Sequence, residues 1–279
     1  MYIPKTEFIF PEKTDDQIFK VRYKRKVKIN RQYYNRLKTF VFKFVQFFFR
    51  ILYVLIAFPL VKIRYHLKVE GKKQLKKYKK TLKKDGFITV SNHVFLWDFV
   101  ALCETMKMGF PKVPMLNELI YSKYGGIFTL AGAVVIPKDR NAFRGFYGFM
   151  DETFKQNKWV HIYPEKGIWY YYAPIRPFFR GAAYFACTYN KPIVPIAYSY
   201  RERKGIAKIF NDKDPYITVH IGEPVYPDMS LPKREAETKL NKEIRNKMIK
   251  MAGFSSEEEN DRVAKQNYRY ENGHYYTVF

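Results

Sequence analysis

Between about residue 62 and residue 253, short apolar runs alternate with stretches of helical periodicity. The runs are rich in β-branched residues, which favours strands over helices. The predicted strands are Arg64–Glu70, Phe87–Val90, Ala133–Ile136, Val160–Tyr163, Ile193–Tyr200 and Tyr216–Ile221, and the predicted helices are Phe95–Lys107, Ala142–Gln156, Gly181–Tyr189 and Lys233–Met251. This alternation predicts a layered α/β domain, in which functional residues gather where strands end and helices begin.

The rest of the chain divides around this domain. We expect a basic N-terminal arm over residues 1–38, a membrane-associated helical segment over 39–61, the α/β domain over 62–253 and a polar, loosely packed tail over 254–279. Cys103 and Cys187 lie in apolar surroundings without zinc-like spacing, which predicts reduced, buried thiols. The histidines have no ligand-like spacing either, so we predict no metal site.

The segment 39–61 is apolar but not uniformly so. Lys43, Gln46 and Arg50 follow one another at steps of three and four, so they share one face of a helix whose other face is Phe, Val, Ile and Leu. Pro59 is expected to end this run. The pattern favours a helix that lies in the membrane interface. A spanning helix stays open as an alternative, because Lys and Arg near the ends can snorkel.

The net charge of +25 requires an anionic partner. The run Lys20–Lys38 contains no acid, and a second run, Lys72–Lys84, reads KKQLKKYKKTLKK. Nucleic acid is a poor candidate because no recognition motif is present and the first run abuts the apolar segment. We therefore expect an anionic membrane surface as partner, with the bulk of the chain on the cytoplasmic face of the cell membrane.

One ionisable pair lies inside the apolar stretch ITVSNHVFLWDFVAL. His93 directly follows a predicted strand, and Asp98 comes five residues later. Ser91 or Asn92 suits a helix N-cap there, so we place His93 at a helix N-terminus, which favours a neutral imidazole that accepts a proton. If the first helical turn is irregular, Asp98 can reach back and orient the ring, as in serine hydrolase triads. No G-x-S-x-G motif surrounds Ser91, so the hydroxyl to be activated belongs to a substrate.

Three further blocks place polar residues at strand ends. WVHIYPEKG ends a predicted strand at Tyr163-Pro164-Glu165, which points a carboxylate into the crevice of the sheet. LAGAVVIPKDRNAFRG places Lys138 and Arg140 after another strand, where they suit a phosphate. FFRGAAYFACTYNKPIVPIAYSY leads from a helix into an apolar strand.

Together, Asn92-His93 with Asp98, the block from Gly132 to Arg140, Tyr163-Pro164-Glu165 and Lys191 to Ile196 resemble the glycerolipid acyltransferases. The chain looks like the lysophosphatidic acid (1-acyl-glycerol-3-phosphate) acyltransferase type, over roughly residues 62–221. The resemblance implies a mixed sheet flanked by helices and a membrane-associated enzyme of phospholipid biosynthesis. It implies acyl transfer from an activated donor to the sn-2 hydroxyl of 1-acyl-glycerol-3-phosphate. It also implies no cofactor, with acyl-CoA, acyl carrier protein or acyl phosphate as co-substrate.

The resemblance also assigns roles to residues. The implied roles are general base for His93, orienting carboxylate for Asp98, phosphate binding for Arg140 and Lys138, and a contact with the glycerol of the acceptor for Glu165. The family's third block reads Phe-Pro-Glu-Gly-Thr-Arg-Ser, whereas here Lys166, Gly167, Ile168 and Trp169 follow the glutamate. Lys166 or Arg176 is then the candidate to replace the missing phosphate contacts. Since these changes lie in acceptor-binding elements, two alternatives stay open: a related acyltransferase with another lyso-lipid acceptor, and an inactive membrane scaffold.

Overall fold

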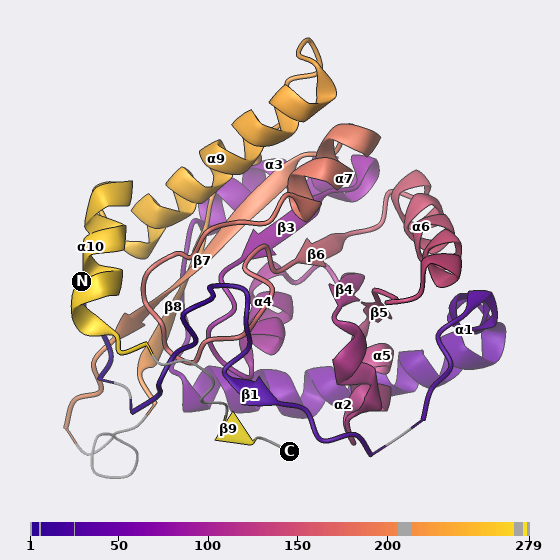
Figure 1. Ribbon diagram of the computed structural model, residues 1–279, viewed down its shortest axis with the longest axis horizontal. Coiled ribbons are helices and arrows are strands. Elements are labelled where there is room, and N and C mark those ends of the chain that lie inside the picture. Colours follow the sequence, from indigo (N-terminus) through magenta and orange to yellow (C-terminus); the bar gives the residue numbers. More distant parts are fainter. Residues whose placement is uncertain (1, 6, 25, 206–213, 271–275, 278–279) are drawn as a thin grey trace.

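The computed structural model describes residues 2–277 except 6, 25, 206–213 and 271–275 (Figure 1). Its strands are β1 (Phe19–Lys20), β2 (Lys68–Glu70), β3 (Ile88–Ser91), β4 (Val113–Met115), β5 (Ala133–Val135), β6 (Val160–Ile162), β7 (Ile193–Arg201), β8 (Tyr216–Ile221) and β9 (Tyr276–Thr277). Its helices are α1 (Arg31–Arg36), α2 (Phe40–Arg64), α3 (Lys72–Asp85), α4 (Asp98–Met106), the 3-10 helix η1 (Asn117–Tyr121), α5 (Gly125–Ala131), α6 (Arg140–Lys155), α7 (Gly181–Tyr189), α9 (Lys233–Ala252) and α10 (Glu257–Asn267).

A five-stranded sheet in the order β2-β8-β7-β3-β6 forms the centre of the domain. β3 pairs in parallel with both β6 and β7, whereas β7 and β8 are antiparallel, so the sheet is mixed. The parallel pair β4 and β5 continues it, because Lys112 forms a parallel bridge to Val160 of β6. Consequently β3, β6, β4 and β5 end at one edge, and the loops that follow them meet there.

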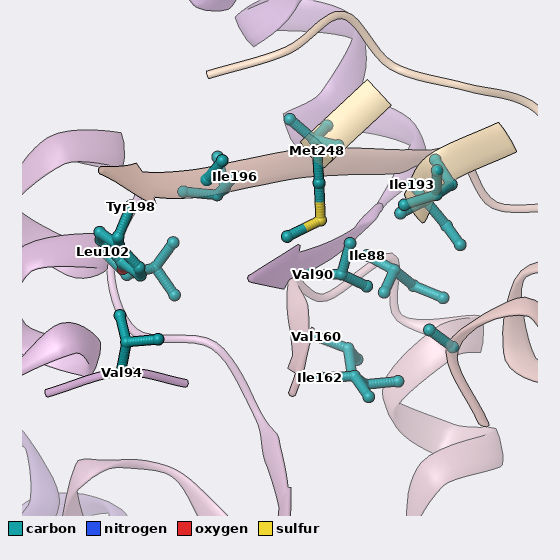
Figure 2. Packing of buried hydrophobic residues seen from close by; sticks show 14 of the residues in the cluster. Ile88, Val90, Val94, Leu102, Val160, Ile162, Ile193, Ile196, Tyr198 and Met248 are labelled. Carbon is teal, nitrogen blue, oxygen red and sulfur yellow. The ribbon is translucent and has the colours of Figure 1, made fainter. Parts of the chain in front are cut away.

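Helices cover the sheet on both faces, as the alternation of strands and helices requires. Figure 2 shows Met248 of α9 above the apolar residues of β3 and β7, while Leu102 of α4 packs on the other side with Val94 and Tyr198. The core residues of β3 are almost completely buried on both faces of the strand. This matches the continuous apolar runs of the sequence, since a strand covered on both faces does not alternate. The expected α/β fold, with a mixed sheet flanked by helices, is confirmed.

The helix α2 runs beneath α4 and α5 as a single element of 25 residues (Figure 1). It is the one helix in the described part of the chain that is long and apolar enough to cross a membrane. The helix passes through Pro59 to Arg64, so the prediction that Pro59 ends it was wrong. Proline removes one N–H, but its flanks remain packed on the domain through Ala57 and Val61. Because α2 extends to Arg64, the predicted strand Arg64–Glu70 begins only at Lys68.

Two other predictions need correction, and one basic run has a structure that we did not predict. The helix predicted over Phe95–Lys107 begins at Asp98, since an irregular turn precedes it. The part of the tail up to residue 270 is not loosely packed, because Ser256 caps α10, three glutamates occupy its first turn, and Asn260 is buried. The lysine-rich run Lys72–Lys84, which we considered only as charge, is the helix α3, with Leu75 and Leu82 buried on its inner face.

The turn between β2 and α3 depends on Gly71, which has a φ of 82° and whose added Cβ would lie 2.1 Å from the carbonyl oxygen of Ile221. Gly109 has a similar φ of 94°, but a Cβ there would meet nothing within 4 Å. We expect Gly109→Ala to cost about 1 kcal/mol of unfolding free energy, from backbone strain alone. Gly71→Ala should cost about 3 kcal/mol or more, because backbone must also move. Urea unfolding of both variants measures the difference, and equal midpoints would contradict the close contact.

Candidate active site

The first block forms a turn that is fixed at the carboxyl end of β3. The buried amide of Asn92 accepts a hydrogen bond from the N–H of Tyr198 at 2.9 Å and donates to the carbonyl of Tyr198 at 3.2 Å. Asn92 therefore acts as a clamp onto β7 rather than as the helix cap that we expected. Because α4 begins only at Asp98, His93 does not lie at a helix N-terminus, and our argument from the helix dipole does not apply to it.

The histidine and the aspartate meet as the irregular turn allows. Nδ1 of His93 lies 2.6 Å from Oδ2 of Asp98, whose side chain is 1% exposed. The same oxygen accepts the N–H of Val94 at 3.2 Å, which holds the carboxylate toward the turn. The imidazole is 21% exposed, and within the described part of the chain no residue hydrogen-bonds to Nε2 of His93. That nitrogen can therefore face a substrate.

Tyr163 is a third member of this arrangement that sequence reasoning missed. Its hydroxyl donates to Oδ1 of Asp98 at 2.8 Å, and its ring stacks on the imidazole of His93 with centroids 3.9 Å apart. Burial raises the pKa of Tyr163 well above its usual value, and the charge of Asp98 adds to this effect. The phenol therefore stays protonated and remains a donor. The sequence signal that could have identified Tyr163 is its position directly after β6, at the edge of the sheet where β3 also ends.

A second histidine lies behind Tyr163. His161 is fully buried, its Nδ1 lies 2.9 Å from the hydroxyl of Thr89, and its Nε2 lies 3.4 Å from that of Ser91. Burial, followed by the nearby His93, lowers the pKa of His161 to about 3, so its ring is neutral at physiological pH. This contact also directs the hydroxyl of Ser91 to His161, which leaves the His93–Asp98 pair without a serine nucleophile. The described residues contain no cluster of His, Cys, Asp or Glu that could hold a metal ion.

Glu165 and Arg176 form a buried ion pair at 2.9 Å, and each side chain is 1% exposed. Glu165 also accepts the N–H of His93 at 3.2 Å and that of Arg176 at 2.9 Å. Burial lowers the pKa of Arg176, and the charge of Glu165 opposes this. The two charges neutralise each other in this structure, and the contact of these side chains with the acceptor stays a prediction. Their observed role is to join the first and third blocks.

An N-terminal strap, residues 14–17, covers the third block from outside. The carbonyl of Thr14 accepts a bond from the guanidinium of Arg176 at 2.8 Å, and that of Asp16 accepts one from the indole of Trp169 at 2.7 Å. Lys166 pairs with Asp15 at 3.1 Å, so its ammonium is engaged by the strap. Gly167 makes room for it, since a Cβ there would lie 2.6 Å from the carbonyl oxygen of Asp16.

The second block lies at the end of β5, on the same edge of the sheet. Lys138 pairs with Glu118 at 2.5 Å, whereas Arg140 is exposed at the first turn of α6, behind the N-cap Asp139. A hollow of about 710 Å³ adjoins the block, and its lining residues are Tyr23, Lys26, Val27, Lys28, Asn117, Tyr121 and Lys138. Of the residues predicted to bind the acceptor, Arg140 is thus the one with an exposed cation and no partner among the described residues.

The fold and the geometry of the His93–Asp98 pair indicate one kind of chemistry. A base oriented by a buried carboxylate, at the strand ends of a mixed α/β sheet and without a serine nucleophile, suits the deprotonation of a substrate's own hydroxyl.

Comparison with known proteins names the family. Residues 66–199 match the family model described as Acyltransferase, a segment that holds all four blocks. Over this segment, just under half of the chain, the protein is similar to acyltransferases, which confirms the resemblance found in the sequence. No curated protein matches the chain.

A crystal structure of the 1-acyl-sn-glycerophosphate (LPA) acyltransferase PlsC from Thermotoga maritima is also similar to this chain. The match covers 64% of this chain and 70% of that chain, at 18% sequence identity and a TM-score of 0.41. A likeness this loose carries no weight for the function of this chain.

The hydroxyl of Tyr163 can be removed without removing its ring. In Tyr163→Phe, Asp98 loses the donor that bonds its Oδ1, so the carboxylate is held less firmly against His93. We expect kcat/KM for acyl transfer to fall by about tenfold while the fold is kept, because the base is less well oriented. Tyr172→Phe is the control, because its hydroxyl bonds Tyr270 instead. A kcat/KM equal to that of the parent protein contradicts the positioning role of Tyr163.

Proposed function

We propose that the protein is a membrane-associated O-acyltransferase that acylates the sn-2 hydroxyl of 1-acyl-glycerol-3-phosphate in phospholipid biosynthesis. The observation that carries this proposal is the 2.6 Å contact between His93 and Asp98, on an imidazole that is 21% exposed and whose Nε2 has no hydrogen-bond partner in the described part of the chain. A base held in one tautomer and not engaged by a nucleophile of its own is suited to a hydroxyl that arrives with the substrate.

The reaction follows from this geometry. Nε2 of His93 removes the proton from the acceptor hydroxyl, while Nδ1–H donates to Asp98, which stabilises the imidazolium as it forms. The acceptor oxygen attacks the acyl carbonyl of the donor and gives a tetrahedral oxyanion. The bond to the leaving group then breaks, and the proton on Nε2 goes to the departing thiolate or phosphate. The products are the acylated lipid and the free carrier, and His93 is neutral again.

The acceptor is proposed from the charges that remain available. Arg140 is exposed at the edge of the sheet where His93 also lies, which fits a phosphate on the acceptor. Acyl-CoA, acyl carrier protein and acyl phosphate all fit the proposed donor role, because each carries the same activated carbonyl.

A second acceptor class, a lysophospholipid or another lyso-lipid, is favoured by a separate observation. Lys138 pairs with Glu118, Lys166 with Asp15, and Arg176 with Glu165. Three of the four predicted phosphate-binding cations are therefore engaged within the protein. This leaves less positive charge for a phosphomonoester than the family's usual third block provides.

Membrane association is proposed from the two faces of α2. Its outer face exposes large apolar side chains along the whole helix, among them Phe40, Phe44, Phe48, Leu52, Leu55 and Ile63. Its inner face packs against α4 and α5, and Gln46 donates to the carbonyl of Leu130 at 2.9 Å. A helix covered by its own domain along one side fits a position in the membrane interface rather than across the bilayer. The basic residues of the chain favour the anionic cytoplasmic leaflet.

His93→Ala tests the enzyme. We expect it to fold and bind vesicles like the parent protein while acyl transfer falls by about 10³-fold or more, because the general base is lost. The assay uses radiolabelled acyl donors with a panel that includes 1-acyl-glycerol-3-phosphate and several lysophospholipids. The preferred acceptor is the one with the highest kcat/KM. Turnover unchanged by the substitution would exclude the proposed mechanism, and a scaffold would acylate no acceptor at all.

The outer face of α2 can be tested apart from catalysis. Phe48→Ser with Leu52→Ser removes two exposed apolar side chains, each worth about 1.5–3 kcal/mol when buried in lipid. We expect the affinity for anionic vesicles in a flotation assay to fall by about 100-fold or more. Tyr226→Ser with Met229→Ser is the matched control, because these residues are similarly exposed but lie outside α2. An equal loss in both pairs would show that α2 is not the binding face.

A further inference from the structure

A cluster of cations without carboxylate partners lies in the seam between α2 and the catalytic domain. Arg50 points inward from α2, and its Nε and Nη2 are buried with no hydrogen-bond partner in the described part of the chain. The guanidinium lies 4.8 Å from the ring of Phe110, and Nη2 lies beside Gly132, 3.6 Å from where a Cβ would be. The charge of Arg50 therefore enters the protein without a compensating one.

Lys112 brings a second cation to the same seam. Its ammonium lies 5.5 Å from the ring of Phe149, and no carboxylate among the described residues pairs with it. Lys38 lies on the same ring at 5.8 Å, but it has a partner, because it bonds Glu152 at 2.5 Å. Burial lowers the pKa of Lys112 to about 8, and the charges of Arg50, Lys43 and Lys158 lower it further. Three other cations thus act on Lys112.

Such an arrangement is costly for a protein on its own. A buried cation without a partner loses hydration, and like charges nearby add repulsion. The geometry also limits which groups could neutralise the charges of Arg50 and Lys112. The donors are a planar guanidinium with two nitrogen atoms that have no partner among the described residues and an ammonium, a combination that suits the oxygen atoms of a phosphate. A carboxylate from the chain could have filled this place, but in the described residues none does.

We propose that the seam between α2 and the catalytic domain binds a phosphate group carried by a membrane lipid. The part of this proposal that assigns the phosphate to a lipid rests on the proposed position of α2 in the membrane interface, where lipid headgroups lie along the flank of the helix. Lys43 is exposed on the same face of α2 as Arg50 and lies at the entrance to the seam. The site is separate from the His93–Asp98 pair, because Arg50 packs near Cys103 and Phe110, toward the other end of α4.

A bound lipid phosphate would hold α2 against the catalytic domain. A phosphate on Arg50 and Lys112 would join α2 to the segment that leads into β4, and so hold the helix in one orientation on the domain. Without the phosphate, repulsion between Arg50 and Lys112 acts to separate the two. Lipid binding and the packing of α2 are then coupled, since the ligand binds the packed arrangement more tightly than a separated one.

The reactivity of the Lys112 amine tests this proposal in the full-length protein. Labelling by an amine-selective reagent at pH 7.5 is followed by mass spectrometry of the peptide. It is measured alone, with inorganic phosphate, with phosphatidylcholine or phosphatidylglycerol vesicles, and with a nonionic detergent that has no phosphate. We expect phosphate-bearing vesicles to slow the labelling of Lys112 at least about fivefold, because a bound anion favours the charged amine. Detergent should leave the rate unchanged.

Two variants make the result specific. Arg50→Met keeps the packing on Phe110 but removes the guanidinium, and it should abolish the protection while leaving the thermal midpoint of the free protein equal or higher. Lys62→Gln, an exposed cation on the same helix, should keep the protection. Protection by detergent as strong as by vesicles, or protection that persists in Arg50→Met, would overturn the proposal.

Flotation of the same samples measures membrane binding independently of phosphate binding. If the protein does not float with vesicles, the proposed membrane association is wrong. The labelling rate of Lys112 with inorganic phosphate then still shows whether the seam binds phosphate. Protection by inorganic phosphate alone supports a phosphate site with a soluble ligand. If the protein floats and neither vesicles nor inorganic phosphate slow the labelling, the seam binds no phosphate.

Discussion

The carboxylate of Glu165 is the point on which the arrangement of the site depends. It accepts the N–H of His93, the N–H of Arg176 and the guanidinium of Arg176, and almost none of it reaches solvent. One side chain thereby fixes the turn after β3 to the loop after β6. Breaking a buried pair of this kind by removing one partner typically costs about 3–5 kcal/mol, because the remaining charge stays buried. The proposed role of His93 as a base requires that rigidity, since a base must be held within hydrogen-bond reach of a proton.

The alternation of apolar runs predicted the central strands and most helices, because strands buried on both faces leave a clear signal in the sequence. The contact between His93 and Asp98 was also predictable, since the spacing allows it when the turn is irregular. The hydroxyl of Tyr163 was not, because its contact with Asp98 spans 65 residues and depends on the order of the strands. Glu165 and Arg176 looked like substrate ligands for the same reason: sequence shows residue type but not which charges neutralise one another.

The two faces of the helix α2 meet different surroundings, and both faces belong to one amphipathic pattern. The sequence predicted that Lys43, Gln46 and Arg50 share one face, and the structure places Gln46 and Arg50 of that face against the domain. The apolar side, which in a soluble protein would be the inner one, is exposed instead. An amphipathic pattern gives the two faces of a helix but not which of them meets the protein. Only the position of α4 and α5 decides that.

The N-terminal strap has a consequence for how the molecule is assembled during synthesis. Its contacts with the third block join residues 151 to 162 positions apart in the chain, so they are among the longest loops that folding must close. Residues 14–17 leave the ribosome well before their partners Lys166, Trp169 and Arg176. When those partners emerge, more than a hundred residues have been synthesised after the end of α2. The strap can therefore dock only after the third block has been made, although it precedes that block in the chain.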